Sequence, residues 1–109
     1  MKNLIVAVLT LLGLALFSQN KVDVIIFSED GDPFFAYVNG IKQNVTPETN
    51  IKMLDLSPNI SLRLEFQNKA YPQIKQNYPL EPGFTHTFRI KKNTKNELKL
   101  RYFGKEPLS

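Results

Sequence analysis

Residues 60–66, with the sequence ISLRLEF, alternate strictly between apolar and polar side chains. Successive side chains of a β-strand point to opposite faces, so this period of two predicts a strand with one face on a core and the other in water. We therefore expect Leu62 and Leu64 in the core and Arg63 and Glu65 on the surface. The stretch decides the fold class because the same period recurs along the chain.

Two more stretches near the C-terminus show this alternation, residues 84–90 (FTHTFRI) and 98–102 (LKLRY). Residues 22–27 (VDVIIF) are apolar on both faces apart from one aspartate, which is typical of a strand in the middle of a sheet. No stretch sustains the apolar spacing of an amphipathic helix in the part of the chain that is expected to fold.

Turn sequences separate these runs. Asn39-Gly40 lies between two short apolar segments, and both residues tolerate a positive φ, so we expect a tight hairpin turn there. The remaining breaks are at residues 30–33, 57–59, 81–83 and 93–96. About seven short strands with this punctuation predict an all-β protein, a small antiparallel β-sandwich that forms a single domain at residues 19–109.

The N-terminus has the pattern of a secretory signal peptide. Lys2 precedes an apolar run from Leu4 to Phe17, and Ser18 opens a polar stretch. As a helix the run would be about 21 Å long, short of the roughly 30 Å core of a bilayer. We therefore expect residues 1–18 to be a cleaved signal peptide, with cleavage after Ala15 as the alternative. The mature protein would then be secreted or periplasmic.

The composition limits how the domain is stabilised and what it binds. About 90 residues remain after cleavage, enough for one modest core, and the chain has no cysteine to form a disulfide. The formal net charge of +4 is mildly basic. This charge is too small to indicate a nucleic-acid partner, and the predicted location outside the cytoplasm also argues against one.

Residues that could carry out catalysis are sparse. The only histidine, His86, falls on the apolar side of its strand, where a histidine is typically a neutral core residue with a hydrogen-bonded ring nitrogen. No serine-centred or metal-ligand motif accompanies it. The sequence therefore predicts a protein that is not an enzyme and that has no cofactor and no catalytic metal.

The densest acidic run is residues 29–32, with the sequence EDGD. Carboxylate oxygens on a loop with a glycine can hold calcium, but the spacing is not that of an EF-hand loop. We expect a solvated turn here, with a weak ion site as the open alternative.

Basic residues gather near the C-terminus. Alternation places Arg89, Lys91, Lys99 and Arg101 on the wet face of one predicted hairpin, with little acid close to them in the sequence. Such a face can bind an anionic envelope polymer, a lipid headgroup or an acidic protein. The alternative is that these cations keep the domain soluble and protect a sheet edge from pairing with other chains.

Two registers of this hairpin are possible. One sets Lys91 beside Glu97 and Arg89 beside Lys99, and the other sets Lys91 beside Lys99 and Arg89 beside Arg101. Like charges directly opposite each other are unfavourable, so we expect the first register, with a loop of about three residues.

Tyrosine and proline cluster at Tyr71-Pro72 and Tyr78-Pro79. Because proline cannot donate to a sheet ladder, the segment between them is predicted to be an edge strand or an extended loop. Tyr71 and Tyr78 either cap the core with their hydroxyls in water or serve as anchors for a sugar or a protein partner.

Several steps of the sequence resemble the PEGA-type domain, namely Val38-Asn39-Gly40, Thr46-Pro47, Leu54-Asp55-Leu56 and the run PGFTHTF at residues 82–88. The resemblance covers residues 22–92. The chain departs from the family pattern at residues 56–59, where a glycine turn is usual, and at residues 67–71. The resemblance implies a non-catalytic module of the bacterial envelope, and it transfers no active site.

Together these features lead us to expect a secreted, non-catalytic interaction or structural module of the bacterial cell envelope. Its partner would be an envelope or extracellular protein. Two alternatives remain: a binder of an anionic glycan or lipid through the basic C-terminal hairpin, and a small secreted enzyme inhibitor. We expect no nucleic-acid partner and no stable membrane span after cleavage.

The signal-peptide pattern predicts the mass of the mature protein. We expect intact-mass analysis of the secreted protein to show an N-terminus between Leu16 and Lys21, because a signal peptidase cuts at the polar exit of the apolar run. A full-length mass, with Met1 retained in the membrane fraction, would contradict the prediction.

Overall fold

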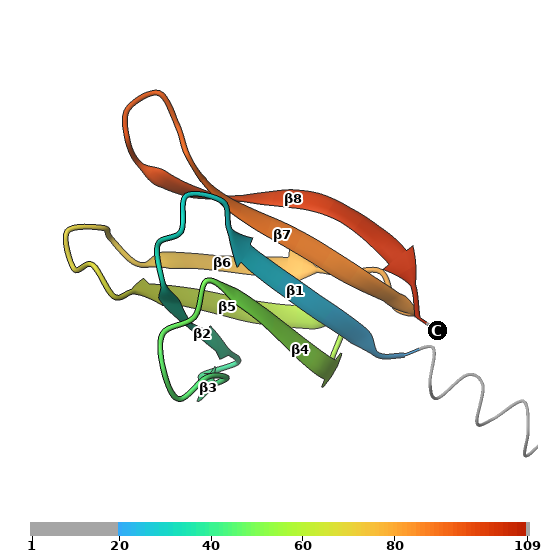
Figure 1. The fold of residues 1–109 in the computed structure, drawn as a ribbon. Helices are drawn as coiled ribbons and strands as arrows, with labels where there is room; N and C mark the ends of the chain where they lie inside the picture. The colour runs from blue at the N-terminus through green and yellow to red at the C-terminus, as the bar shows by residue number, and fades with distance from the viewer. Residues whose placement is uncertain (1–19, 109) are drawn as a thin grey trace, which may run out of the picture.

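The computed structural model describes residues 20–108, which form eight β-strands and no helix (Figure 1). The strands are β1 (Val22–Ser28), β2 (Phe34–Val38), β3 (Ile41–Lys42), β4 (Asn50–Leu56), β5 (Asn59–Phe66), β6 (Ile74–Pro79), β7 (Phe84–Lys92) and β8 (Leu98–Pro107). The predicted signal peptide at residues 1–18 lies outside the described residues. Among the described residues, no helix is long and apolar enough to cross a membrane.

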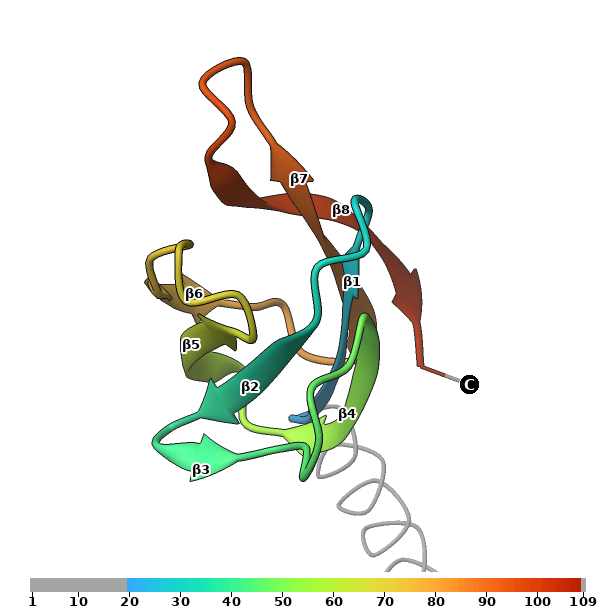
Figure 2. The ribbon, with the colours of Figure 1, turned by 60° about the vertical axis from the view of Figure 1, so that its left-hand side comes forward.

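The eight strands form two sheets that pack as a sandwich. The first sheet has the order β4-β1-β7-β8, and the second has the order β3-β2-β5-β6 (Figures 1 and 2). The central position expected for residues 22–27 is confirmed, because β1 lies between β4 and β7. All pairs are antiparallel except β1 and β7, which run parallel. This differs from the fully antiparallel sandwich that the sequence predicts.

The core lies between the two sheets and follows the alternation of the sequence. Leu62 and Leu64 are 2% and 0% exposed, so their predicted burial is confirmed. Arg63 and Glu65 point to the other face of β5 and are half-buried. The guanidinium of Arg63 lies 3.7 Å from the ring centre of Tyr37 and 3.3 Å from the carboxylate of Glu65.

The turn at Asn39-Gly40 is the tight hairpin turn that the sequence predicts. Asn39 has φ 51 and Gly40 has φ 82, so both residues adopt the positive φ of a type I′ turn. The side-chain Oδ1 of Asn39 also accepts the backbone N–H of Ser61 at 2.9 Å. The turn is thereby tied to the start of β5.

A bulge divides β8. Register along the β7–β8 ladder shifts between Thr87 and Phe88, so one residue of β8, Phe103, has no partner in β7. Phe103 lies on the outer face of the first sheet, where its ring meets that of Phe27 edge-on at 5.4 Å. Beyond the bulge, β8 continues to Pro107 and is longer than the predicted strand at residues 98–102.

The two sides of the sandwich differ. On one side, the segment that leads into β4 bonds to both sheets: Glu48 exchanges backbone hydrogen bonds with Phe34, and Thr49 accepts the N–H of Ser28 at 2.8 Å. On the other side, β6 is the edge of one sheet and β8 is the edge of the other, with no pairing between them (Figure 2). The edge-strand prediction for the segment between Tyr71 and Tyr78 is therefore confirmed.

The positive φ of Gly40 predicts a cost for any β-branched residue there. Gly40→Val is expected to lower the free energy of unfolding by about 1–3 kcal/mol, because the backbone conformation is strained for a side chain even though the space around it is open. Gly104→Val is the matched control: its surroundings are equally open, but its φ is not in the left-handed region, and the expected change is within about 0.5 kcal/mol. Equal denaturant melts for the two variants would contradict the turn assignment.

Candidate functional site

The β7–β8 hairpin turns at a three-residue loop, Thr94 to Asn96. Asn96 adopts φ 62, and the N–H of Asn93 donates to the carbonyl of Glu97 at 2.9 Å, which closes the hairpin. Oδ1 of Asn93 accepts the N–H groups of Lys95 and Glu97, both at 2.9 Å. The loop is therefore held by its own asparagines.

This loop sets a register that differs from the one we expected. Lys91 pairs with Lys99 and Arg89 pairs with Arg101, so the expected pairings of Lys91 with Glu97 and of Arg89 with Lys99 are wrong. Two things outweigh the repulsion between like charges. The asparagine loop fixes the ladder, and an acidic group from outside the hairpin neutralises the two cations of β7.

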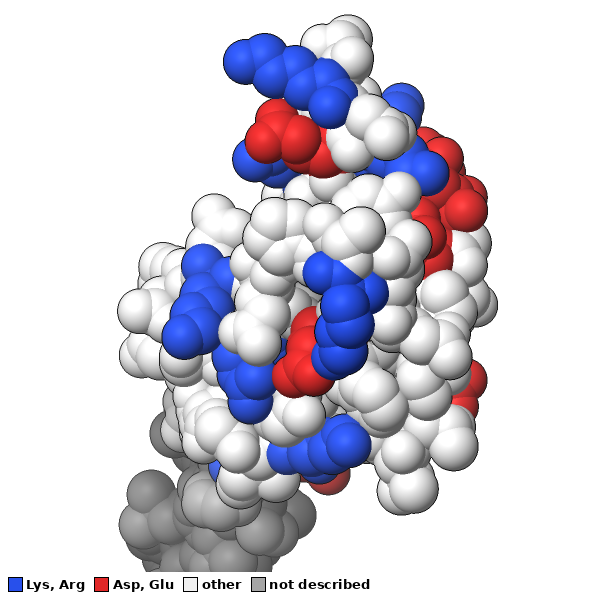
Figure 3. All heavy atoms as spheres, turned by 90° about the vertical axis from the view of Figure 1, so that its left-hand side faces the viewer, with Lys and Arg blue, Asp and Glu red and all other residues white. Residues whose placement is uncertain are grey.

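That acidic group is the carboxylate of Glu29, in the turn after β1. Glu29 carboxylate oxygens lie 3.3 Å from the Arg89 guanidinium and 3.8 Å from Nζ of Lys91. Nζ of Lys92 lies 3.9 Å from Asp32. Figure 3 shows basic and acidic atoms interspersed on one face of the molecule, including at the hairpin tip at the top. Little acid lies near Arg89 and Lys91 in the sequence, but the fold brings Glu29 to both of them.

The same contacts account for the acidic run EDGD at residues 29–32. Glu29 and Asp32 face cations of β7, and Asp30 accepts the backbone N–H of Lys92 at 3.0 Å. Within residues 20–108, no group of three or more His, Cys, Asp or Glu side chains is placed to hold a metal ion. The acidic turn therefore acts as the counter-charge of the basic residues of β7.

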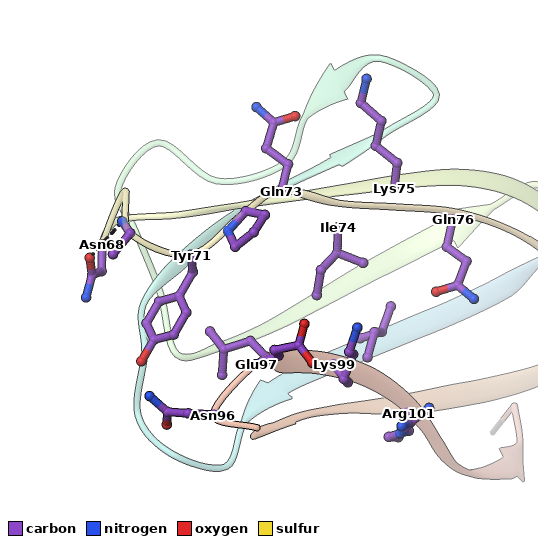
Figure 4. A pocket seen from close by; sticks show the side chains of 14 residues that line it. Asn68, Tyr71, Gln73, Ile74, Lys75, Gln76, Asn96, Glu97, Lys99 and Arg101 are labelled. Atoms are coloured by element: carbon purple, nitrogen blue, oxygen red, sulfur yellow. Dashed lines mark hydrogen bonds between the residues drawn. The ribbon is translucent and has the colours of Figure 1, made fainter. Parts of the chain in front are cut away.

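A groove of about 700 Å³ runs along the open side of the sandwich, between β6 and β8 (Figure 4). Ile74 and Gln76 of β6 point across it toward β8, whereas Gln73 and Lys75 point away. The lining residues come from the β5–β6 loop and β6 on one side and from the start of β8 on the other: Asn68, Ala70, Tyr71, Pro72, Gln73, Ile74, Lys75, Gln76, Asn96, Glu97, Leu98, Lys99, Leu100 and Arg101.

The groove brings together three of the six predicted partner-binding residues. Tyr71 lies at one end, where its ring meets that of Phe66 at 6.0 Å, and Lys99 and Arg101 line the β8 side. Both cations lie on the outer face of β8, so they form the rim of the groove and not its floor. Arg89 and Lys91, on β7, face the acidic turn instead.

The sixth residue, Tyr78, lines a neighbouring hollow of about 450 Å³ together with His86 and Tyr102. Its ring packs against Phe88 with the centres 4.7 Å apart, so it caps the core as the structural alternative predicts. Burial raises the pKa of the Tyr78 hydroxyl, and the positive charge of Arg101 partly opposes this rise.

His86 is a core residue with both ring nitrogens hydrogen-bonded, and it is 2% exposed. Nε2 lies 2.8 Å from the backbone carbonyl of Glu81, which can only accept, so Nε2 carries the proton. Nδ1 then accepts the hydroxyl proton of Tyr102 at 2.7 Å. The predicted core histidine with a hydrogen-bonded ring is confirmed, and its partner Tyr102 had not been singled out from the sequence.

Sequence reasoning also missed Gln76. Ile74, Gln76 and Tyr78 alternate along β6, so one polar residue shares a face with two half-buried ones. The feature of the sequence that could have identified Gln76 is a polar side chain on the inward face of a predicted edge strand.

The position of Tyr78 predicts a dependence of stability on alkaline pH. A pKa raised by folding gives stability that is present below the unfolded value, about 10, and is lost as pH rises through the folded value. We expect the free energy of unfolding to fall less steeply above pH ~10 in Tyr78→Phe than in the wild type. Burial also raises the pKa of Tyr102, so the decline is reduced and not abolished. Parallel curves for the two proteins in alkaline denaturant melts would contradict the prediction.

The groove offers apolar contact, amide groups and a basic rim, a combination suited to binding. No family model matches the chain, and the searches of curated proteins and of solved structures found no match.

Proposed function

We propose that this chain is a secreted or periplasmic, non-catalytic interaction module of the bacterial cell envelope, and that its partner binds in the β6–β8 groove. In this proposal residues 1–18 are removed and residues 19–109 form the module. The groove is the observation that carries the proposal. Its volume of about 700 Å³ is in the size range of protein binding sites, and it lies between the edge strands of the two sheets.

The distribution of charge also favours the groove over the basic hairpin as a whole. Arg89 and Lys91 are engaged by Glu29, at 3.3 Å and 3.8 Å. Lys99 and Arg101 form no ion pair within residues 20–108, and both line the groove. Of the four basic residues predicted to bind a partner, the two that remain available are therefore those of the groove rim. A partner that also bound Arg89 and Lys91 would first have to displace Glu29.

The floor of the groove explains how a partner could gain binding energy there. Leu98 and Leu100 are buried at the edge of the core, and Ile74 is half-buried opposite them. A partner side chain placed over this floor removes apolar surface from water, at about 25 cal/mol per Å². Gln76 and Tyr71 supply hydrogen-bonding groups beside this floor, which can fix the orientation of the partner.

Blocking the groove tests the proposal. Gln76→Trp places a bulky ring on the inward face of β6, and Asn77→Trp places the same ring on the outward face of the same strand. Both sites are exposed, so both variants are expected to keep the wild-type melting temperature.

In a pull-down from an envelope extract at high salt, we expect the wild type and Asn77→Trp to retain the same protein and Gln76→Trp to lose it. Equal retention by all three proteins would show that the partner binds elsewhere on the molecule. A Gln76→Trp variant that melts early would be replaced by Gln76→Arg, which narrows the groove with a flexible side chain.

A further inference from the structure

Only every second residue of β8 forms backbone hydrogen bonds to β7, and the backbone groups of the others face the groove. Asn93 and Glu97 form a hydrogen-bonded pair next to the loop. In an antiparallel ladder such pairs alternate with non-hydrogen-bonded pairs, so Lys99 and Arg101 bond to β7. Leu98 and Leu100 fall in the other positions, and their N–H and C=O groups point away from β7 toward the groove.

The backbone of β6 makes that strand a poorer pairing edge than β8. Leu80 donates to the carbonyl of Pro58 at 2.8 Å, so the outward backbone groups of β6 belong to Lys75, Asn77 and Pro79. Pro79 has no N–H, and Pro72 stands just before the strand. β8 carries no proline until Pro107 and offers an unbroken stretch from Leu98 to the bulge beside Phe103.

Side-chain alternation along β8 then defines the two faces of any strand added there. The side chains of Leu98 and Leu100 point into the core, and a residue of the new strand on that face meets Ile74 and Gln76 across the groove. Lys99 and Arg101 point to the outer face. A residue of the new strand on the outer face lies beside these two cations.

We propose that the partner is an extended peptide segment that adds to β8 as a further strand, with acidic side chains on the outer face alternating with apolar ones on the inner face. The inference rests on the proposed function, because it names the partner of the same groove. Backbone hydrogen bonds to Leu98 and Leu100 give affinity, and the alternation gives specificity. The bulge at Phe103 ends the pairing, so the added strand spans about five residues.

A synthetic peptide of eight alternating valine and glutamate residues is the probe. We expect it to slow amide hydrogen exchange at Leu98 and Leu100, measured by NMR, and to leave the exchange of Lys99 unchanged, because that N–H already bonds to β7. A peptide of the same composition in the order valine-valine-glutamate-glutamate and a polyglutamate chain are the controls. Both are expected to bind at least about tenfold more weakly, since neither places acid and apolar groups on opposite faces.

Charge reversal provides a matched pair of variants. Lys99→Glu is expected to weaken binding of the alternating peptide about tenfold, because a cross-strand attraction becomes a repulsion. Lys52→Glu makes the same change on the other edge strand of the same sheet, at an exposed lysine that has no ion pair within residues 20–108, and is expected to leave binding unchanged. If both variants weakened binding of the peptide equally, the effect would come from the net charge of the protein and not from β8, and the inference would be overturned.

The outcomes separate this inference from the proposed function. If Gln76→Trp abolishes capture of the envelope partner but the alternating peptide does not protect Leu98 and Leu100, the groove binds its partner without strand addition, and the inference falls. Equal binding of polyglutamate and the alternating peptide would point to an anionic polymer, such as an acidic glycan, and would also overturn it. If the peptide protects both amides while Gln76→Trp leaves capture of the native partner unchanged, the proposed function falls.

Discussion

The parallel pairing of β1 with β7 determines most of what is distinctive in this structure. Because the two strands run in the same direction, their C-terminal ends lie at the same end of the first sheet, with Ser28 opposite Ile90. The turn after β1 is thereby brought against the basic end of β7, and the N–H of Glu29 donates to the carbonyl of Ile90 at 2.9 Å. In an antiparallel pair, the acidic turn and the basic residues would lie at opposite ends.

This placement divides the basic residues of the hairpin into two sets. The cations of β7 are neutralised by a turn about sixty residues away in sequence, and each such half-exposed pair contributes about 0–1 kcal/mol. Lys99 and Arg101, on β8, lie one strand farther from β1 and form no ion pair within residues 20–108, whereas Lys105, beyond the bulge, pairs with Glu81. Among Arg89, Lys91, Lys99 and Arg101, the charges left without an acidic partner therefore lie at the sheet edge, beside the groove.

The sequence predicts the local features of this fold and not the long-range ones. Alternation identified the buried face of β5, and Asn39-Gly40 identified the turn, because both depend on neighbouring residues alone. The hairpin register was predicted from cross-strand charges worth a few tenths of a kcal/mol, which the asparagine loop and Glu29 outweigh. The groove was not predicted, because which strands become edges depends on how distant segments pair.

The positive charges of Lys99 and Arg101, at the rim of the groove, act on two kinds of strand that could pair with β8. An unpaired edge strand can pair with a second copy of the same chain, and cations on the edge oppose this. Two β8 edges brought together would place Lys99 and Arg101 of one copy beside those of the other, which is repulsive whichever residues are directly opposite. An acidic strand experiences attraction at the same positions. Lys99 and Arg101 would therefore oppose self-association at β8 and, in the proposed strand addition, favour a partner strand that carries acidic side chains.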